Sequence, residues 1–354
     1  MPAPRWTVFC RVVDNLGDAG VGWRLATGLA ALGQRVRLVI DDAAPLAFMA
    51  PAGAPGVEVQ PWPGHGHGGD AGGEVEVGDV VIEAFGCDPP PAFVDAMAAR
   101  ASPPVWINLE YLSAEAYVER SHGLPSPQPG GLVKWFYYPG FTPRTGGLLR
   151  ESGLAAARAA FDPAAWLASQ GLRRAPGERL ASLFCYDGAP LAALLPALAR
   201  EPTRLLVTQG VGAAHDAALG VALPGLRVQR LPWLSQDGFD RLLWACDLNF
   251  VRGEDSLVRA IWAGAPFVWQ AYPQHDGAHA AKVEALLAQA AAGPEVARLW
   301  RAWNGLPGAG TGLELPEPAP WAASVQRWRS GLLAQPDLAA ALLAFARGKA
   351  GTGW

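Results

Sequence analysis

Short runs of apolar, often β-branched residues alternate with Ala- and Leu-rich stretches of helical period along most of the chain. The runs are continuously apolar, which is typical of parallel strands covered by helices on both faces. They predict strands at 7–13, 36–40, 80–85, 105–109, 180–186, 204–208, 226–231, 248–251 and 266–269. The intervening patterns predict helices at 23–32, 93–101, 191–200, 237–245 and 256–263. Repeated β-α units indicate a doubly wound α/β fold.

The alternation stops over 121–145, which is rich in Pro, Gly and aromatic residues and has no clear period. A second β-α series begins near residue 180. We therefore expect two Rossmann-like domains, at 1–150 and 179–320, joined by a linker region at 151–178. We expect helices within 321–354, and we expect this segment to cross back to the first domain.

Composition narrows the class of protein. Apolar residues make up 51% of the chain and charged residues 17%, which excludes a disordered chain. The net charge of −4 offers no basic footprint for nucleic acid or for a membrane surface. No apolar run reaches the roughly 18 residues of a membrane span, and no signal-peptide pattern opens the sequence. We expect a soluble, cytoplasmic protein.

The four cysteines show no C-x-x-C spacing, which argues against a zinc or redox motif. Three of them, Cys10, Cys185 and Cys246, lie inside apolar runs and are typical of small buried side chains in a reducing compartment. No metal site is therefore expected.

A polar, glycine-rich loop follows the first predicted strand. It contains Asp14, Asn15, Gly17, Asp18 and Gly20. The glycines are spaced G-x-x-G-x-G, so the dinucleotide fingerprint G-x-G-x-x-G is absent. Because carboxylates repel phosphate, the two acids favour a cationic or proton-donating acceptor. The alternative is that they form only turn and helix-cap hydrogen bonds.

A second polar loop follows the strand predicted at 248–251. It contains Arg252, Gly253, Glu254, Asp255 and Ser256, and Asp255 or Ser256 is suited to cap the next helix. Backbone N–H groups at a helix start, together with an arginine, are suited to bind a diphosphate. A carboxylate such as that of Glu254 accepts hydrogen bonds from sugar hydroxyls. The alternative is an ordinary cap beside a surface Arg–Glu pair.

Aromatic residues end two strands of the second domain. Phe184 and Tyr186 close one strand, and Trp233 with Gln236 follows another. An aromatic ring can stack on a nucleobase, and an amide can bind a base edge with one donor and one acceptor. Aromatic residues in the core are the commoner alternative.

Several stretches together resemble the EarP family, the protein-arginine rhamnosyltransferases that modify translation elongation factor P (EF-P). Relative to the family pattern, Leu16 and Ala19 replace an aromatic residue and Ile, Trp233 replaces Phe, and the Gly- and His-rich stretch 64–73 is an insertion. The matching stretches are VVDNLGDAGVGWRLA (12–26), VIEAFGCDPP (81–90), WINLEYLSAE (106–115), HGLPSP (122–127), PGFTPRTGGLLRE (139–151), SLFCYD (182–187) and a long block at 231–279.

The resemblance implies a GT-B fold, in which two Rossmann-like domains face each other across a cleft. It implies inverting transfer of rhamnose from dTDP-β-L-rhamnose to an arginine of EF-P. No cofactor is expected, and because the sequence shows no D-x-D metal motif, we expect the reaction to be independent of metal ions. EF-P is then the acceptor partner of the first domain, for which 106–145 is our candidate surface, and the second domain binds the donor.

Roles follow by position. Asp18 resembles the general base, Asp14 its supporting acid and Glu254 an essential glutamate near the donor. Arg252 and Ser256, in the RGEDS segment with Gly253 and Asp255, resemble contacts to the diphosphate. The residues that resemble those around the thymidine nucleotide are Phe184, Tyr186, Trp233 and Gln236.

Three other functions compete with this one. A GT-B transferase or epimerase with a small-molecule acceptor would explain the diphosphate-like loop but would leave the two aspartates without a cation to bind. A nucleotide-sugar-binding scaffold would bind the donor without turnover. An NAD-dependent dehydrogenase is disfavoured by the missing fingerprint.

Overall fold

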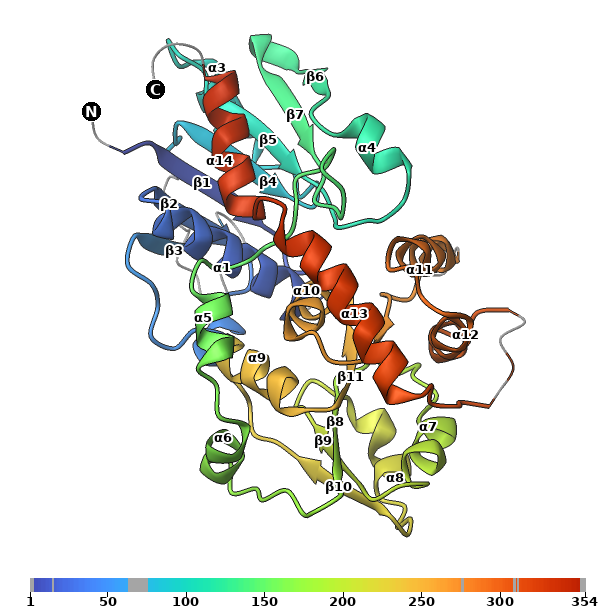
Figure 1. Cartoon of the computed structure of the whole chain (residues 1–354). Helices are drawn as coiled ribbons and strands as arrows, with labels where there is room; N and C mark the ends of the chain where they lie inside the picture. Colours follow the sequence, from blue (N-terminus) through green and yellow to red (C-terminus); the bar gives the residue numbers. More distant parts are fainter. Residues whose placement is uncertain are drawn as a thin grey trace. The chain divides into compact units, whose positions relative to one another are not determined.

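The computed structural model describes residues 3–14, 16–62, 76–274, 277–307, 310 and 312–350 of the 354-residue chain. These residues form two compact units, each built around its own sheet (Figure 1). Unit 1 consists of Met1–Ser152 with Gln335–Trp354, and unit 2 consists of Gly153–Ala334. The loop 64–73 and Asn15 lie outside the described residues.

In the described part of unit 1, seven strands form a sheet in the order β3-β2-β1-β4-β5-β7-β6. All neighbours are parallel except β6, which is antiparallel to β7. The strands are β1 (Arg5–Cys10), β2 (Arg35–Ile40), β3 (Val57–Pro61), β4 (Val80–Ala84), β5 (Val105–Leu109), β6 (Pro125–Pro127) and β7 (Val133–Tyr137). The helices are α1 (Leu16–Ala31), α2 (Leu46–Met49), α3 (Pro91–Ala98), α4 (Tyr117–Ser121) and α14 (Leu338–Lys349), with a 3-10 turn at Pro129–Gly131.

Helices cover both faces of the unit 1 sheet because successive side chains of its central strands point to opposite faces. On one face, Val8 of β1 is buried with Leu29 of α1 and Leu342 of α14. On the other face, Phe9 of β1 is buried with Phe93 of α3. Both faces of the strand therefore need apolar residues, which explains the continuous run in the sequence.

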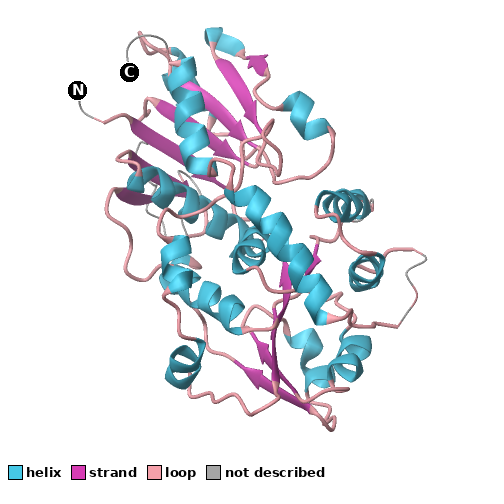
Figure 2. Ribbon diagram, in the orientation of Figure 1, coloured by secondary structure: helices cyan, strands magenta, loops and turns pink. Residues whose placement is uncertain are grey.

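Unit 2 is also built from a parallel sheet and the helices around it (Figure 2). Five strands of its described part are ordered β10-β9-β8-β11-β12. They are β8 (Arg179–Leu183), β9 (Thr203–Val207), β10 (Leu226–Arg230), β11 (Leu248–Arg252) and β12 (Phe267–Gln270). The helices are α5 (Leu154–Ala159), α6 (Pro163–Ser169), α7 (Leu191–Leu198), α8 (Asp216–Leu219), α9 (Gln236–Ala245), α10 (Gly253–Ala263), α11 (Ala278–Gln289), α12 (Pro294–Trp303) and α13 (Pro318–Leu333), with a 3-10 turn at Ala213–His215.

The segment 151–178, expected to be a linker, is mostly part of unit 2. It contains α5 and α6, and Trp166, Leu167 and Leu172 are buried with Leu180 and Leu206 of the sheet. These side chains are too few and too widely spaced to give a periodic pattern in the sequence, so their burial was not anticipated.

The C-terminal helices divide between the two units. α13 belongs to unit 2, whereas α14 belongs to unit 1, where it lies beside α1 (Figure 1). The two helices of unit 1 approach closely at Gly28, where an added Cβ would lie 3.1 Å from the Cβ of Ala339. The chain therefore returns to the first unit between α13 and α14.

The segment 121–145, which shows no period, contains β6 and β7. These strands lie at the edge of the sheet, where β7 is only partly buried and β6 begins and ends with proline. An edge strand of this kind has no continuous apolar run, and β3 at the opposite edge was missed for the same reason.

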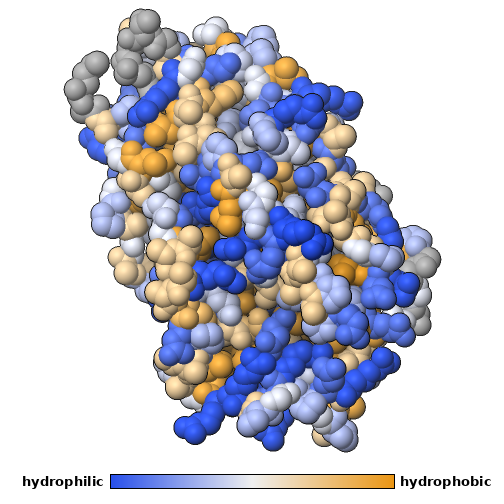
Figure 3. Space-filling view, viewed as in Figure 1, coloured by the Kyte–Doolittle hydropathy of each residue, from blue (hydrophilic) through white to orange (hydrophobic). Residues whose placement is uncertain are grey.

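All four cysteines are buried and unbridged. Burial raises the pKa of the Cys87 and Cys185 thiols to about 12, so both stay protonated at neutral pH. Across the described residues, no helix combines the length and apolarity needed to span a bilayer. On the face drawn in Figure 3, hydrophilic and hydrophobic residues are interspersed.

A buried ion pair joins α9 to α10. The Nε of Arg259 lies 2.7 Å from Oδ1 of Asp240, and its Nη2 lies 2.6 Å from Oδ2. The two side chains are only 1% and 6% exposed. We predict that Arg259→Met lowers the free energy of unfolding by about 3–5 kcal/mol, because a buried carboxylate loses its cation.

Urea denaturation measures this loss. Arg301→Met is the matched control, since the Arg301–Glu284 pair has side chains 40% and 47% exposed. Its expected cost is below about 1 kcal/mol. Equal losses in the two variants would contradict the assignment of a structural role to the buried pair.

Candidate active site

Each sheet has a point at which the order of its strands reverses. In unit 1 the chain builds outward from β1 to β3 and then adds β4 on the other side of β1. In unit 2 it builds outward from β8 to β10 and then adds β11 on the other side of β8. Ligands of doubly wound sheets bind beyond the carboxyl ends of the strands at such a point. We therefore place the candidate site of unit 1 beyond the carboxyl ends of β1 and β4, and that of unit 2 beyond the carboxyl ends of β8 and β11.

The loop after β1 is closed by the carboxylate of Asp18. Its Oδ2 accepts hydrogen bonds from the backbone N–H groups of Val13 (2.8 Å) and Asp14 (2.9 Å). Asp18 lies in the first turn of α1, where the helix dipole favours a negative charge, and it is only 4% exposed. The turn hydrogen bonds of the alternative interpretation are thus present. Oδ2 accepts both of these hydrogen bonds, so they do not involve the second carboxylate oxygen, Oδ1.

Burial raises the pKa of Asp18 above its ordinary value, because loss of water disfavours the charged form. The N–H groups of Asp14 and Val13 act in the opposite direction, and the negative charge of Asp41 adds to the rise. A carboxylate with a raised pKa takes up a proton more readily than a solvated aspartate does. The environment of Asp18 therefore suits a general base.

Asp14 is half-buried and belongs to the same loop. The N–H of Gly17 donates to the carbonyl of Asp14 at 2.7 Å, and a Cβ added at Gly17 would lie 2.9 Å from Asp14 Oδ2. The absent side chain of Gly17 thus leaves room for the Asp14 carboxylate. Gly20 is buried further along α1.

Asp41 at the carboxyl end of β2 was not anticipated from the sequence. Its Oδ1 accepts hydrogen bonds from the N–H groups of Val12 (2.8 Å) and Asp42 (2.9 Å). It therefore anchors the start of the loop that carries Asp14. The available signal was an Asp-Asp pair directly after a buried strand, next to the strand that bears the first loop.

The carboxyl ends of β4 and β5 carry an aromatic pair. Phe85 has a φ of +61°, which is rare for a residue other than glycine. Its ring stacks on Tyr111, with centroids 4.4 Å apart and planes at 13°. The neighbouring Glu110 accepts a hydrogen bond from Asn108 Nδ2 at 2.8 Å, and burial raises its pKa. No residue type or spacing around Phe85 indicates this backbone conformation.

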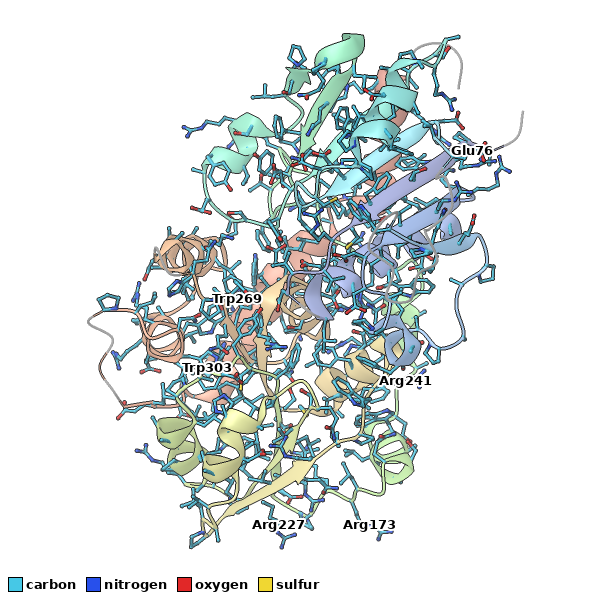
Figure 4. All side chains as sticks on the ribbon, turned by 180° about the vertical axis from the view of Figure 1, so that it is seen from behind. Glu76, Arg173, Arg227, Arg241, Trp269 and Trp303 are labelled. Carbon is cyan, nitrogen blue, oxygen red and sulfur yellow. The ribbon has the colours of Figure 1, made fainter. Side chains whose placement is uncertain are left out.

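In unit 2, Arg252 ends β11 and is the N-cap of α10, whose first residue is Gly253. Gly253 has a φ of +66°, which glycine adopts without strain. The N–H of Arg252 donates to Ser256 Oγ at 3.1 Å, and the Ser256 hydroxyl donates to the Arg252 carbonyl. Trp269, labelled in Figure 4, donates its Nε1–H to the carbonyl of Gly253 at 2.7 Å.

The helix therefore begins three residues earlier than its pattern predicts. Asp255 and Ser256, expected to cap it, lie within its first turn, and so does Glu254. Glu254 and Asp255 are half-buried, and Ser256 is buried. The glycine at position 253, which has low helix propensity, concealed the true start.

Phe184 and Tyr186 follow β8 and lie against Arg252. The guanidinium carbon of Arg252 is 4.4 Å from the ring centroid of Phe184 and 4.3 Å from that of Tyr186. Trp233 (52% exposed) and Gln236 (8% exposed) instead follow β10, an edge strand separated from β8 by β9. The structure thus gathers Phe184, Tyr186 and Arg252. It leaves Trp233 on the loop after β10 and Gln236 at the start of α9.

The two loop clusters differ in the charges that they carry. The unit 1 loop presents the carboxylates of Asp14 and Asp18, whereas the unit 2 loop combines the Arg252 guanidinium and the N–H groups of a helix start with the carboxylates of Glu254 and Asp255. Within the described ranges, no three or more His, Cys, Asp or Glu side chains are grouped to hold a metal ion.

Two parallel-sheet units of this kind define the GT-B class of glycosyltransferases. The chain is similar in fold to the kitacinnamycin glycotransferase, with a TM-score of 0.56 and 17% identity over 97% of this chain and 99% of that one. It is also similar to the spinosyn rhamnosyltransferase SpnG, with a TM-score of 0.51 and 14% identity over 97% of this chain and all of the other. These likenesses concern the fold alone.

Closer relatives fix the family. A family model described as elongation factor P (EF-P) rhamnosyltransferase EarP matches residues 6–347, and the chain belongs to this family of glycosyltransferases. A protein-arginine rhamnosyltransferase of Pseudomonas aeruginosa is 46% identical over 96% of this chain and 98% of that protein. A solved structure described as the structural basis for EarP-mediated arginine glycosylation of translation elongation factor EF-P is 33% identical. It has a TM-score of 0.64 and covers 98% of this chain and 99% of its own. The resemblance noted from the sequence is confirmed.

The positive φ of Gly253 generates a prediction. Gly253→Ala is expected to lower the free energy of unfolding by about 1–2 kcal/mol, because a Cβ is strained in the left-handed region. Gly331→Ala is the control, since Gly331 is exposed inside α13 and its added Cβ would meet nothing within 4 Å. That change is expected to stabilise by about 0.5–1 kcal/mol. Urea denaturation compares the two, and a stabilising effect of Gly253→Ala would contradict the proposed helix start.

Proposed function

We propose that the protein transfers rhamnose from dTDP-β-L-rhamnose to an arginine side chain of EF-P, with inversion at the anomeric carbon. Membership of the EarP family and the 46% identity to a protein-arginine rhamnosyltransferase support the reaction. The observation within the chain that carries the proposal is the buried Asp18 carboxylate, whose pKa is raised, at the strand-order reversal of unit 1.

In this proposal Asp18 is the general base and Asp14 supports it. A guanidinium is charged in water and is a poor nucleophile, so it must be bound, oriented and relieved of a proton. Two carboxylates on one loop can bind the guanidinium and direct one nitrogen toward the sugar. The new N–C bond forms as the bond from the anomeric carbon to the diphosphate oxygen breaks, and the proton passes from that nitrogen to Asp18.

Unit 2 would bind the donor. The departing thymidine diphosphate gains negative charge, which Arg252 and the N–H groups at the start of α10 can stabilise. Ser256 is a further diphosphate contact, and Gly253 allows the close approach of backbone. Glu254 would accept hydrogen bonds from the sugar hydroxyls, and Asp255 lies beside it. Phe184, Tyr186, Trp233 and Gln236 surround the thymidine in this assignment, and no metal ion is required.

The alternative keeps the donor site and replaces the acceptor with a small molecule. Release of thymidine diphosphate from dTDP-β-L-rhamnose separates the two. The proposal predicts release with EF-P and none with free arginine, because a single arginine offers too little surface for selective binding. Equal release with free arginine would favour the small-molecule acceptor.

Asp18→Asn tests the general base. The amide can still accept hydrogen bonds from the two loop N–H groups but cannot take up the proton. We expect turnover to fall by about 10²–10⁴-fold, with unchanged affinity for thymidine diphosphate. Asp95→Asn, a change of the same kind on the exposed face of α3, should leave turnover unchanged. Wild-type turnover in Asp18→Asn would remove the assignment.

The raised pKa of Asp18 also predicts the pH dependence of the reaction. As pH falls through this pKa the base becomes protonated, so kcat/KM should drop tenfold per pH unit. The midpoint should lie above about 3.9, the value of an ordinary aspartate. A rate profile that stays flat down to that value would show that the ionisation of Asp18 does not limit the reaction.

The contribution of Asp18 to the free energy of unfolding should depend on pH in the opposite direction to its contribution to the rate. Because the folded pKa of Asp18 lies above the unfolded one, its contribution to stability is complete below the unfolded pKa and is lost as pH rises through the folded pKa. Asp18→Asn has no charge to bury, so at pH 7–8 it should be at least as stable as the wild type. This advantage should shrink as pH is lowered. Urea denaturation of both proteins at several pH values measures this difference in stability. If Asp18→Asn were much less stable than the wild type at pH 8, the predicted direction of the effect would be contradicted.

A further inference from the structure

The two rings expected to stack on a nucleobase instead contact a cation of the protein itself. The guanidinium carbon of Arg252 lies over the Phe184 ring at 4.4 Å and over the Tyr186 ring at 4.3 Å. Both distances are well inside the limit of roughly 6 Å for a cation–π contact. One face of each ring is therefore taken by Arg252.

Arg252 is also held by its backbone and by its side-chain nitrogen. Its N–H donates to Ser256 Oγ at 3.1 Å, and its Nη1 donates to the carbonyl of Cys185 at 3.4 Å. Cys185 lies between the two aromatic residues in the chain. The guanidinium thus contacts three successive residues that follow β8.

Phe184 is fixed by neighbours on one strand and one helix. Its N–H donates to the carbonyl of Phe250 on β11 at 2.9 Å. Its ring packs edge-to-face on Phe239 of α9, with centroids 5.8 Å apart. The ring is thereby placed by the packing of unit 2 before any ligand binds.

Tyr186 is fixed still more firmly and is only 8% exposed. Its N–H donates to Oε1 of the buried Gln270 at 2.9 Å, and its carbonyl lies 3.0 Å from His215 Nε2. Its ring makes an edge-to-face contact with Tyr272, with centroids 5.4 Å apart. The two hydrogen bonds fix the backbone of Tyr186, and moving its ring away from Arg252 would disturb the contact with Tyr272.

We propose that Phe184 and Tyr186 are positioning residues that hold the Arg252 guanidinium ready for the diphosphate of the donor, and are not the platform for its base. The inference rests on the proposed function, in which Arg252 contacts the diphosphate. It changes the role that the sequence assigned to the two rings.

The physical reason is preorganisation. A free arginine side chain loses rotamer entropy when it is ordered. Two ring contacts and a hydrogen bond impose that order in the unliganded protein, so ligand binding does not have to. Ring contacts do not use up the N–H donors of a guanidinium, which can form bidentate hydrogen bonds to phosphate oxygens.

The proposal also bears on where the thymine base of the donor stacks. Arg252 occupies one face of each ring, and Tyr186 is only 8% exposed, so we expect thymine to stack on another aromatic surface of unit 2. Trp233, which is 52% exposed after β10, is the remaining aromatic residue that the sequence assigns to the nucleotide. Phosphate recognition and base stacking then belong to different loops of the same sheet edge.

Calorimetric titration with thymidine diphosphate and with thymidine tests the proposal. Phe184→Leu and Tyr186→Leu should each weaken thymidine diphosphate binding by about tenfold, the upper range of a cation–π contact, and should leave thymidine binding unchanged. Phe184→Tyr and Tyr186→Phe keep the rings and should restore wild-type affinity. Phe161→Leu removes a ring that packs on Trp166 and Trp244 elsewhere in unit 2 and should change neither affinity.

A double-mutant cycle adds a readout that does not depend on weak thymidine binding. In an Arg252→Met background, the two leucine substitutions should have no further effect on thymidine diphosphate affinity, since the cation they position is gone. Equal effects in both backgrounds, or equal losses for thymidine and thymidine diphosphate, would overturn the proposal. Wild-type protein that binds thymidine diphosphate no better than thymidine would instead refute the proposed donor site, and the inference with it.

Discussion

Two hydrogen bonds from the N–H groups of Val13 and Asp14 to the carboxylate of Asp18 are the interaction on which the site of unit 1 depends. They connect the end of β1 to the first turn of α1 and so set the path of the loop between them. They also stabilise an anion that burial would otherwise drive toward its protonated form. One side chain thus shapes the loop and carries a carboxyl group with a raised pKa. The partial burial of that charge reduces stability, which is common where a site is built for reactivity.

Unit 2 uses the same topology with a different set of charges. Its reversal of strand order also joins a strand to the start of a helix, but the residues there are Arg252 and Gly253, followed by Glu254 and Asp255. The left-handed conformation of Gly253 turns the chain directly from β11 into α10, so the backbone N–H groups of the helix start follow directly on Arg252. A fold that repeats one architecture can therefore carry different polar groups at the same place in each unit, because its loops tolerate change.

The buried central strands could be read from the sequence, and the site loops only in part. β5 and most of β2 were predicted with their boundaries because they are apolar on both faces. The start of α1 was placed seven residues too late, since Gly17, Gly20 and Gly22 in its first two turns interrupt the helical pattern. The acids and the RGEDS segment were found because polar residues directly follow buried strands. What the sequence does not contain are contacts between distant segments, such as Asp41 with Val12, and backbone angles such as that of Phe85.

The role of Phe184 and Tyr186 illustrates the same limit. An aromatic residue at a strand end is equally compatible with a nucleobase, a core or a cation. Only the placement of β8 beside β11 brings Arg252 onto both rings. Residue type alone led us to expect ligand contacts at this edge of the sheet, and the three-dimensional contact is the basis of the more specific role that we propose for each side chain.

The central claim is that the carboxylates of one unit and the cationic donors of the other act on a single transfer to arginine. Intact-mass analysis of EF-P after incubation with this protein and dTDP-β-L-rhamnose tests it most directly, with fragmentation to locate the modified residue. The account predicts a gain of one deoxyhexosyl unit on one arginine. An unchanged mass, or a sugar on any other type of residue, would contradict it.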